Sequence, residues 1–222
     1  FRGKYSKGIP KFNTITHLLA LLEKEKIIKK KYQILVKKNI PQKSGMGGGS
    51  MNAASILSFF FKKKILTKKL SEKFAKKIGS DVILGLNKFP KVYLPSGKIR
   101  ILKTRIKYYL LLVKPNFGCS TRKIFSANKA FSESKLGKLK NVSKTMIRNS
   151  ENDLENSAFR LYPNLFKLKN KLLSWKKAKF VRMTGSGSTL VMYFNTKVSA
   201  KNALKMSKRK LNNCWCILSK VI

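Results

Sequence analysis

The chain has 222 residues, enough for one large domain or two small ones, and 43% of them are hydrophobic, so a packed core is expected. It carries 51 Lys and Arg against 8 Asp and Glu, a formal net charge of +43. The longest uninterrupted apolar run, residues 108–113, is far shorter than the roughly 20 residues of a membrane-spanning helix, which predicts a cytoplasmic protein with no membrane partner.

In the first half of the chain, apolar periodicity and capping residues predict three helices. Thr14 is the expected N-cap of the first helix and Ser50 that of the second, while Gly79 ends the third. The expected elements are a helix over 14–25, a strand over 32–37, a loop over 39–49, a helix from residue 50 and a helix over 68–78.

The second half is predicted to mix strands and helices. It holds a strand at 108–113, a helix after Ser120, two helices between 151 and 175 with Pro163 in a first turn, and a closing strand, helix and strand. The sequence Lys-Pro-Asn at 114–116 is interpreted as the seam between two domains, 1–114 and 115–222.

The high positive charge invites a nucleic-acid-binding hypothesis. Most of the basic residues are lysines, however, and they are spread over nearly every segment, whereas bidentate recognition of phosphates and bases relies on Arg. We therefore interpret them as a solvated surface and expect no nucleic-acid partner, with a basic RNA-binding protein kept as an alternative.

The cysteines carry no recognisable site. Cys119, Cys214 and Cys216 cannot all pair within one chain, and His17 is the single histidine. This composition supports neither a disulfide framework, nor a zinc site, nor a Cys-His nucleophile.

A glycine-rich loop is the most informative stretch of the sequence. Gly45, Gly47, Gly48 and Gly49 lead directly into the Ala- and Phe-rich helix. Backbone N–H groups that are free of side chains, at the positive end of a helix dipole, form an anion site that most often binds phosphate. The loop is neither a Walker loop, because no Lys-Ser or Lys-Thr follows the glycines, nor a dinucleotide fingerprint, because Ser50 replaces the third glycine.

The stretch "PQKSGMGGGSMNAA", residues 41–54, resembles the Pro-x-x-x-Gly-Leu-Gly-Gly-Gly-Ser-Ser-Asn-Ala-Ala signature of the GHMP kinase superfamily. Met46 replaces Leu, and Met51 replaces the second Ser, with the loss of one possible hydroxyl contact. The resemblance implies ATP and Mg²⁺ as cofactors, with Ser50 as the metal contact. The residues implied to bind ATP are Pro41, Gly45, Met46, Gly47, Gly48, Gly49, Ser50 and Asn52.

Three further stretches are similar to one branch of the superfamily: "IGSDVILGL" at 78–86, "ENDLE" at 151–155 and "MTGSGSTLVMYF" at 183–194. This branch phosphorylates the 2-hydroxyl of a cytidine diphosphate-linked methylerythritol, in the methylerythritol phosphate route to isoprenoid precursors. The resemblance implies that Asp81 is the catalytic base; the alternative is that Asp81 caps the next segment. Another kinase of the superfamily, of the homoserine or mevalonate type, remains an alternative function.

The same resemblance implies a set of substrate-binding residues. Phe125 falls where the family places an aromatic ring on cytosine, although an ordinary core Phe fits equally well. Asp153 and Glu155 are interpreted as residues that cap and brace a helix. The remaining implied substrate contacts are Thr121, Gly185, Ser186 and Gly187, where a simple tight hairpin is the alternative for the two glycines.

The sequence also departs from the family pattern. Ile83 replaces the Pro that follows Asp-Val, and no counterpart of the opening motif with its substrate-contacting Lys is present, so we expect a segment before Phe1 and little activity without it. The implied fold is α+β, with an N-terminal domain like the second domain of ribosomal protein S5 and a C-terminal split β-α-β (ferredoxin-like) domain. A monomer or homodimer acting on a small-molecule substrate is expected.

Overall fold

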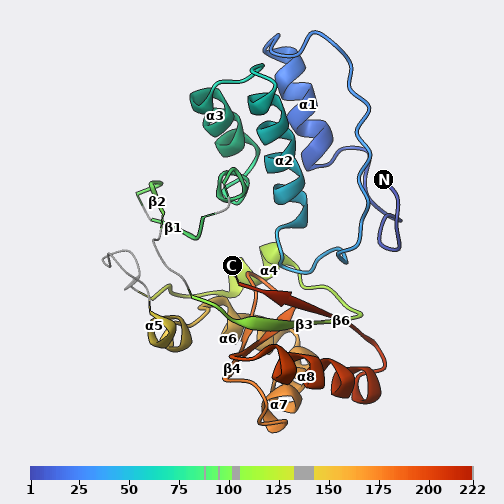
Figure 1. Cartoon of the computed structure of the whole chain (residues 1–222), viewed down its shortest axis with the longest axis vertical. Helices are drawn as coiled ribbons and strands as arrows, with labels where there is room; N and C mark the ends of the chain where they lie inside the picture. The colour runs from blue at the N-terminus through green and yellow to red at the C-terminus, as the bar shows by residue number, and fades with distance from the viewer. Residues whose placement is uncertain (88, 95, 102–105, 133–142, 222) are drawn as a thin grey trace. The chain divides into compact units, whose positions relative to one another are not determined.

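The computed structural model describes residues 1–87, 89–94, 96–101, 106–132 and 143–221 (Figure 1). The chain divides into two units. Unit 1 comprises 1–40 and 47–101, and unit 2 comprises 41–46 and 102–222. The glycine-rich loop therefore begins in unit 2 and ends in unit 1.

Unit 1 is built on three helices that share one apolar core. Leu18, Leu22, Leu57, Phe60 and Phe74 are fully buried there, because each helix turns one apolar stripe towards the other two. A short 3-10 turn and a two-stranded antiparallel hairpin complete the described part of the unit. The elements are α1 (Thr14–Lys24), α2 (Gly48–Lys62), α3 (Lys68–Ile78), η1 (Ile83–Gly85), β1 (Lys91–Tyr93) and β2 (Ile99–Ile101).

The three predicted helices are present, but two of the predicted caps are wrong. The N-cap of α1 is Asn13, whose side chain accepts hydrogen bonds from the backbone N–H groups of Ile15 and Thr16. The N-cap of α2 is Gly47 rather than Ser50, because the glycine adopts a left-handed conformation that allows the helix to start earlier. Gly79 does follow the last residue of α3, as predicted.

The strand predicted at 32–37 is not formed. Residues 32–38 alternate between half-buried and exposed, as in extended chain, but their only described bridge joins Lys37 to Arg2. A strand needs a partner along its whole length, and Arg2 supplies one at a single position.

Unit 2 is an antiparallel four-stranded sheet in the order β4-β5-β3-β6, with helices in the connections. The chain order strand, helices, strand, strand, helix, strand is that of the split β-α-β fold, and the expected α+β class is confirmed. The elements are β3 (Tyr109–Pro115), α4 (Thr121–Ala127), α5 (Lys144–Asn149), α6 (Leu154–Leu161), α7 (Pro163–Ser174), β4 (Phe180–Met183), β5 (Leu190–Phe194), α8 (Lys197–Lys210) and β6 (Cys214–Lys220).

The core of unit 2 lies between this sheet and its helices, where Leu111, Leu165, Leu172 and Leu190 are fully buried. Pro163 occupies the first turn of α7 and a helix follows Ser120, as predicted; Ser120 is also the N-cap of that helix, α4. The expected seam at 114–116 falls on a continuous strand, since β3 pairs with β6 as far as Pro115. The two units instead separate after Ile101.

Candidate active site

The start of α2 in unit 1 offers an open set of backbone donors. Gly47 has φ of 63° and makes no side-chain cap, so the N–H groups of the first helical turn, Gly48 to Ser50, point away from the helix without an intrahelical acceptor. A Cβ built on Gly47 meets nothing within 4 Å, and one on Gly48 lies 3.7 Å from the ammonium of Lys38. This unhindered helix terminus, with a cation beside it, has the chemistry of a phosphate site.

The first part of the glycine-rich loop is held by the segment 183–194, inside unit 2. The hydroxyl of Thr184 donates a 2.5 Å hydrogen bond to the carbonyl of Gly45, and the N–H of Thr189 donates to the carbonyl of Ser44 at 3.3 Å. A Cβ on Gly45, where φ is 68°, would collide with the carbonyl oxygens of Thr184 and Gly187. Only glycine fits this close approach of two backbones.

Asp81 lies in unit 1, in the exposed turn between α3 and η1. The residues after it anchor this turn, because Val82 and Ile83 are buried in the core that also holds Ala53 and Ala54 of α2. Ile83, which departs from the family pattern, thus packs in the core, while Asp81 stays exposed.

The contact between η1 and α2 is also close. A Cβ on Gly85 would lie 2.6 Å from Cβ of Ala54 and 2.9 Å from Cε of Met51, so η1 packs directly on the N-terminal half of α2. The segment that follows Asp81 and the helix that follows the glycines are therefore one packed assembly within unit 1.

Thr121 and Ser186 come together in unit 2. Their hydroxyl oxygens are 2.8 Å apart, and Thr121 lies in the first turn of α4 while Ser186 lies in the turn between β4 and β5. A pocket of about 430 Å³ opens beside Thr121. It is lined by Lys43, Gly45, Gly118, Cys119, Ser120, Thr121, Tyr162 and Gly187.

The Cys119 thiol in this wall is buried, which raises its pKa to about 11 in spite of the opposing charge of Lys114. It is therefore protonated at neutral pH and does not act as a nucleophile.

Phe125 is an exposed aromatic residue rather than a core residue. It is 48% exposed on α4, and its ring lies 6.3 Å from that of Phe131. Both rings line a second pocket of about 430 Å³, together with Asn152, Met183 and Gly185. The alternative of an ordinary core Phe is wrong, and the site combines an open aromatic face with polar backbone groups.

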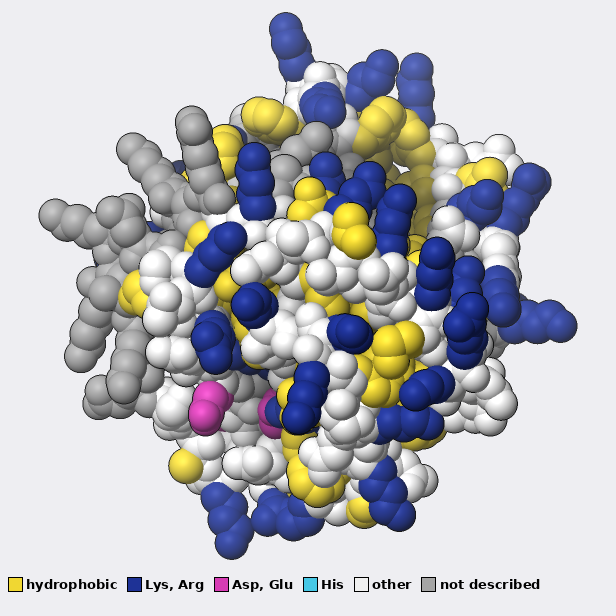
Figure 2. All heavy atoms as spheres, turned by 60° about the horizontal axis from the view of Figure 1, so that its bottom comes forward, with side chains coloured by type: hydrophobic (Ala, Val, Ile, Leu, Met, Phe, Trp, Pro, Cys, Tyr) yellow, Lys and Arg dark blue, Asp and Glu magenta, His cyan; other side chains and the backbone are white. Residues whose placement is uncertain are grey.

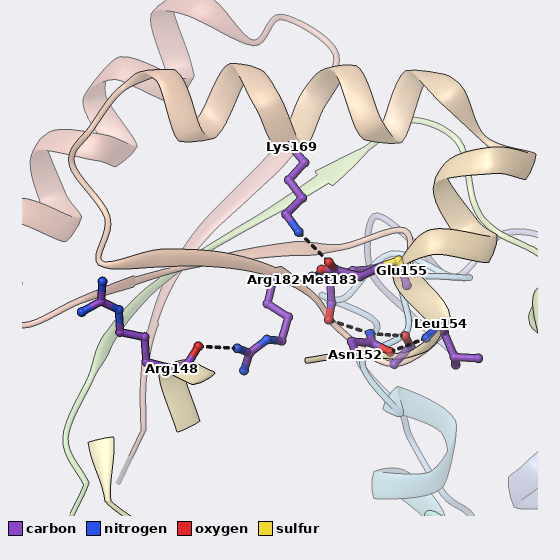
Figure 3. A network of polar contacts seen from close by, with 8 residues as sticks. Arg148, Asn152, Leu154, Glu155, Lys169, Arg182 and Met183 are labelled. Atoms are coloured by element: carbon purple, nitrogen blue, oxygen red, sulfur yellow. Dashed lines mark hydrogen bonds and ion pairs between the residues drawn. The ribbon is translucent and has the colours of Figure 1, made fainter. Parts of the chain in front are cut away.

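The "ENDLE" segment fastens α6 to the end of β4 (Figure 3). The amide of Asn152 donates to the carbonyls of Met183 at 3.0 Å and Gly185 at 2.8 Å. The carboxylate of Glu155 accepts the N–H of Met183 and forms a 2.5 Å ion pair with Lys169 of α7. Glu155 thus braces this corner, as predicted, and fixes the start of the Gly185 turn.

Asp153 is the N-cap residue of α6, but its side chain makes no cap hydrogen bond. The side-chain oxygen of Asn152 instead accepts the N–H of Leu154. The carboxylate of Asp153 instead accepts hydrogen bonds from the N–H and hydroxyl of Ser132 at 2.9 Å. Its geometry satisfies a loop rather than the helix terminus.

Three residues that support the site were not singled out from the sequence: Lys38, Asn152 and Thr184. Asn152 and Thr184 lie inside quoted motifs, and the place of each in its motif was the available signal. Lys38 is one of many lysines, and only the folded chain distinguishes it. Among the described residues, no group of three or more His, Cys, Asp or Glu side chains could hold a metal ion.

Comparison with known proteins gives a consistent result. The model of the GHMP kinases N terminal domain matches residues 13–88, and that of the GHMP kinases C terminal domain matches residues 127–213. A protein of Pelagibacter ubique named 4-diphosphocytidyl-2-C-methyl-D-erythritol kinase is 47% identical over the whole of this chain and 81% of its own length. A protein of the same name from Fusobacterium nucleatum is 31% identical over 90% of this chain and 72% of its own length.

Solved structures share the fold. A crystal structure of 4-(cytidine 5'-diphospho)-2C-methyl-D-erythritol kinase matches with a TM-score of 0.77 at 21% identity, covering 98% of this chain and 81% of its own. Homoserine kinase from Cytophaga hutchinsonii matches with a TM-score of 0.71 at 17% identity, over 99% and 80% of the two chains.

Within the described residues, none of the helices has the length and apolar character to cross a membrane. The two family models together span most of the chain, and the identity to the Pelagibacter ubique relative extends over all of it. The chain therefore belongs to the GHMP kinase family, as a phosphotransferase of the branch that contains the 4-diphosphocytidyl-2-C-methyl-D-erythritol kinases.

Proposed function

We propose that this protein transfers the terminal phosphoryl group of ATP to the 2-hydroxyl of 4-diphosphocytidyl-2-C-methyl-D-erythritol, in the methylerythritol phosphate route to isopentenyl diphosphate. The observation that carries the choice of acceptor is the exposed ring of Phe125 above a pocket with the amide of Asn152 and the backbone of Gly185. A flat aromatic face beside polar groups is the chemistry that recognises a nucleobase. The 47% identical relative bears the name of this kinase.

The start of α2 fits the phosphates of ATP. The N–H groups of Gly48, Gly49 and Ser50 face an open position, since a Cβ on Gly47 meets nothing within 4 Å. The chain before this helix would be kept in place by the hydrogen bond from Thr184 to Gly45, and Asn52 would follow in the next turn. Pro41 precedes the loop, and Met46 lies within it between Gly45 and Gly47.

The hydroxyl of Ser50, on α2, would be a ligand of the magnesium ion. It lies in the first helical turn among the same free N–H groups, and hydroxyl oxygens are ligands of Mg²⁺ in phosphoryl-transfer sites. When bound, the ion neutralises charge on the phosphates. Lys38 adds a further positive charge near Gly48.

Asp81 is proposed as the general base. Phosphoryl transfer requires alignment of the acceptor hydroxyl with the terminal phosphate and removal of the hydroxyl proton. Asp81 and Asp153 are the two aspartates of the chain, and Asp153 is engaged with Ser132. The exposed Asp81 carboxylate, on a turn anchored by Val82 and Ile83, is free to accept that proton.

The acceptor is held by groups of unit 2 in this proposal. The ring of Phe125 would stack on cytosine, and the Thr121 and Ser186 hydroxyls would bind polar groups of the acceptor from the neighbouring pocket. Gly185 and Gly187, on either side of Ser186, would contact the acceptor through their backbone, because Gly45 and Met183 fill the space that a side chain would take at these two positions. We propose that the two functional domains divide after Ile101, ahead of the boundary at 114 that the sequence predicts.

Two other functions have less support. Homoserine kinase shares the fold with this chain at 17% identity, and a shared fold does not identify the acceptor of this chain. An RNA-binding role would need a concentrated basic surface, whereas Lys and Arg are scattered over the coloured part of the face drawn in Figure 2. We propose a small-molecule substrate, a cytoplasmic location and a monomer or homodimer, with neither nucleic acid nor membrane as a partner.

The assignment of the cytosine position is tested by binding of cytidine diphosphate to a Phe125→Ala variant. Loss of a base-stacking ring costs about 1–3 kcal/mol, so affinity should fall by about tenfold or more. Phe166→Ala is the matched control, because Phe166 is 49% exposed on α7, outside both pockets. Equal affinity of the Phe125→Ala variant and the wild type would contradict the proposed acceptor site.

A further inference from the structure

Lys114, in β3, is a buried cation that the proposed mechanism does not use. It is 3% exposed and is the single charged residue among the buried side chains of the described part of the chain. Lysines are almost never fully buried unless they are paired, because removal of the ammonium from water is costly. Lys114 is the most deeply buried lysine of the described residues, and this position calls for a specific reason.

The ammonium of Lys114 binds backbone carbonyls instead of a carboxylate. It donates hydrogen bonds of 2.8 Å to the carbonyl oxygens of Pro115 and Phe117, and no ion pair of the described residues includes it. Burial lowers the pKa of Lys114, while the neighbouring Cys119 and Cys214 oppose this shift. Replacement of Lys114 by an apolar side chain of similar length would remove the cost of burying the ammonium together with its two hydrogen bonds, and these two effects oppose each other.

The turn that Lys114 holds is fixed from other sides too. The Ser188 hydroxyl donates to the same Phe117 carbonyl at 2.8 Å. The ring of Phe117 stacks on that of Tyr162, with 6.4 Å between centroids and 10° between planes. The Tyr162 hydroxyl in turn accepts the N–H of Ser120 at 2.9 Å.

This turn leads directly into the wall of the Thr121 pocket. Residues 118–121 follow it without a gap, and all four line that pocket. Lys114 itself is not part of the lining, so it can affect a ligand only through the backbone that it holds. Misplacement of a binding group by about 1 Å can cost about 100-fold in rate.

We propose that Lys114 is a positioning residue for the phosphoryl acceptor: by binding the carbonyls of Pro115 and Phe117, it sets the place of the Thr121 hydroxyl and thereby the affinity for the acceptor. This inference rests on the proposed function. It assigns to Lys114 an effect on the acceptor site rather than on ATP or on global stability.

The test uses Lys114→Met, which keeps the length of the side chain and removes the charge and the donors. The KM for the cytidyl acceptor should rise about tenfold or more, because the pocket wall is displaced. The KM for ATP should stay within about twofold, and the melting temperature should change little. The control is Lys201→Met, at an exposed position of α8 in the same unit, which removes the same charge and should alter none of these values.

Two further measurements keep the test decisive if Lys114→Met folds poorly. Ser188→Ala removes the second donor to the Phe117 carbonyl and should raise the acceptor KM about threefold. Hydrogen exchange of the amides in residues 117–121 should accelerate in both variants and remain unchanged in Lys201→Met.

The outcomes separate the two proposals. An acceptor KM that stays at the wild-type value in Lys114→Met and in Ser188→Ala, or that rises together with the KM for ATP, contradicts the role of Lys114 alone. Wild-type protein that neither binds nor phosphorylates the cytidyl acceptor contradicts the proposed function itself, and with it the inference.

Discussion

The hydroxyl oxygens of Thr121 and Ser186 lie 2.8 Å apart, although 65 positions separate the two residues in the chain. One belongs to the first turn of α4, and the other to the turn between β4 and β5. This contact joins two segments that are distant in the chain, and Thr121 also lines the adjoining pocket, so Ser186 can orient the hydroxyl that a ligand bound there meets.

Thr121→Val and Ser186→Ala should each weaken acceptor binding without unfolding the protein. Loss of one hydrogen bond to a ligand costs about 0.5–1.5 kcal/mol, which predicts an increase of about three- to tenfold in the acceptor KM. Because the hydroxyls also contact each other, the double variant should be less impaired than the product of the two single effects. Steady-state kinetics of the four proteins measures this coupling, and strictly multiplicative effects would show that the two hydroxyls act separately.

Gly45 and Gly47 form a matched pair for the role of close packing in the loop. Both have positive φ, but a Cβ on Gly45 would strike Thr184 and Gly187, whereas one on Gly47 meets nothing within 4 Å. Gly47→Ala should lower the free energy of unfolding by about 1–2 kcal/mol through backbone strain alone. Gly45→Ala should lower the free energy of unfolding by roughly 1–3 kcal/mol more than Gly47→Ala does, because its Cβ overpacks the loop. Denaturant unfolding compares the two variants, and equal losses would contradict the packing of Gly45.

Glu155→Gln should destabilise unit 2 far more than Glu25→Gln destabilises unit 1. The side chains of Glu155 and Lys169 are 14% and 19% exposed, and removal of one partner from a buried ion pair costs about 3–5 kcal/mol. Glu25 pairs with Lys73 and Lys77 at the surface, where such pairs contribute little. Urea unfolding measures both effects, and similar losses in the two variants would mean that the Glu155 bridge is not a structural brace.

Asp81→Asn should abolish most of the phosphoryl transfer while ATP still binds. General-base catalysis contributes about 100-fold or more to a rate, so the variant should keep less than about a hundredth of the activity. Glu72→Gln is the control, because it neutralises a carboxylate at an exposed position of α3 in the same unit. Activity above about a tenth of the wild-type value in the Asp81 variant is inconsistent with a general base.

The helices could be predicted from the sequence because their signals are local. Apolar periodicity and Pro163 were enough to place α1, α3, α6 and α7. The strand predicted at 32–37 is absent although the burial of these residues does alternate. A strand also needs a partner strand, which the local sequence does not reveal. The start of α2 failed because a left-handed glycine can cap a helix without any side chain.

The site shows the same division between local and distant information. The glycines and Phe125 could be named from their motifs, and Phe125 is exposed as binding requires. The contacts from Thr184 to Gly45 and from Asn152 to Gly185 join segments 139 and 33 positions apart. The register of β3 against β6 determines that Lys114 is buried. The composition of the chain does not distinguish Lys114 from any other lysine.

The most direct test of the central claim is phosphoryl transfer from Mg-ATP to 4-diphosphocytidyl-2-C-methyl-D-erythritol. Homoserine and mevalonate serve as competing acceptors. The account predicts selective phosphorylation of the cytidyl substrate. Turnover of homoserine or mevalonate instead, or no turnover of any acceptor by folded protein, would contradict it.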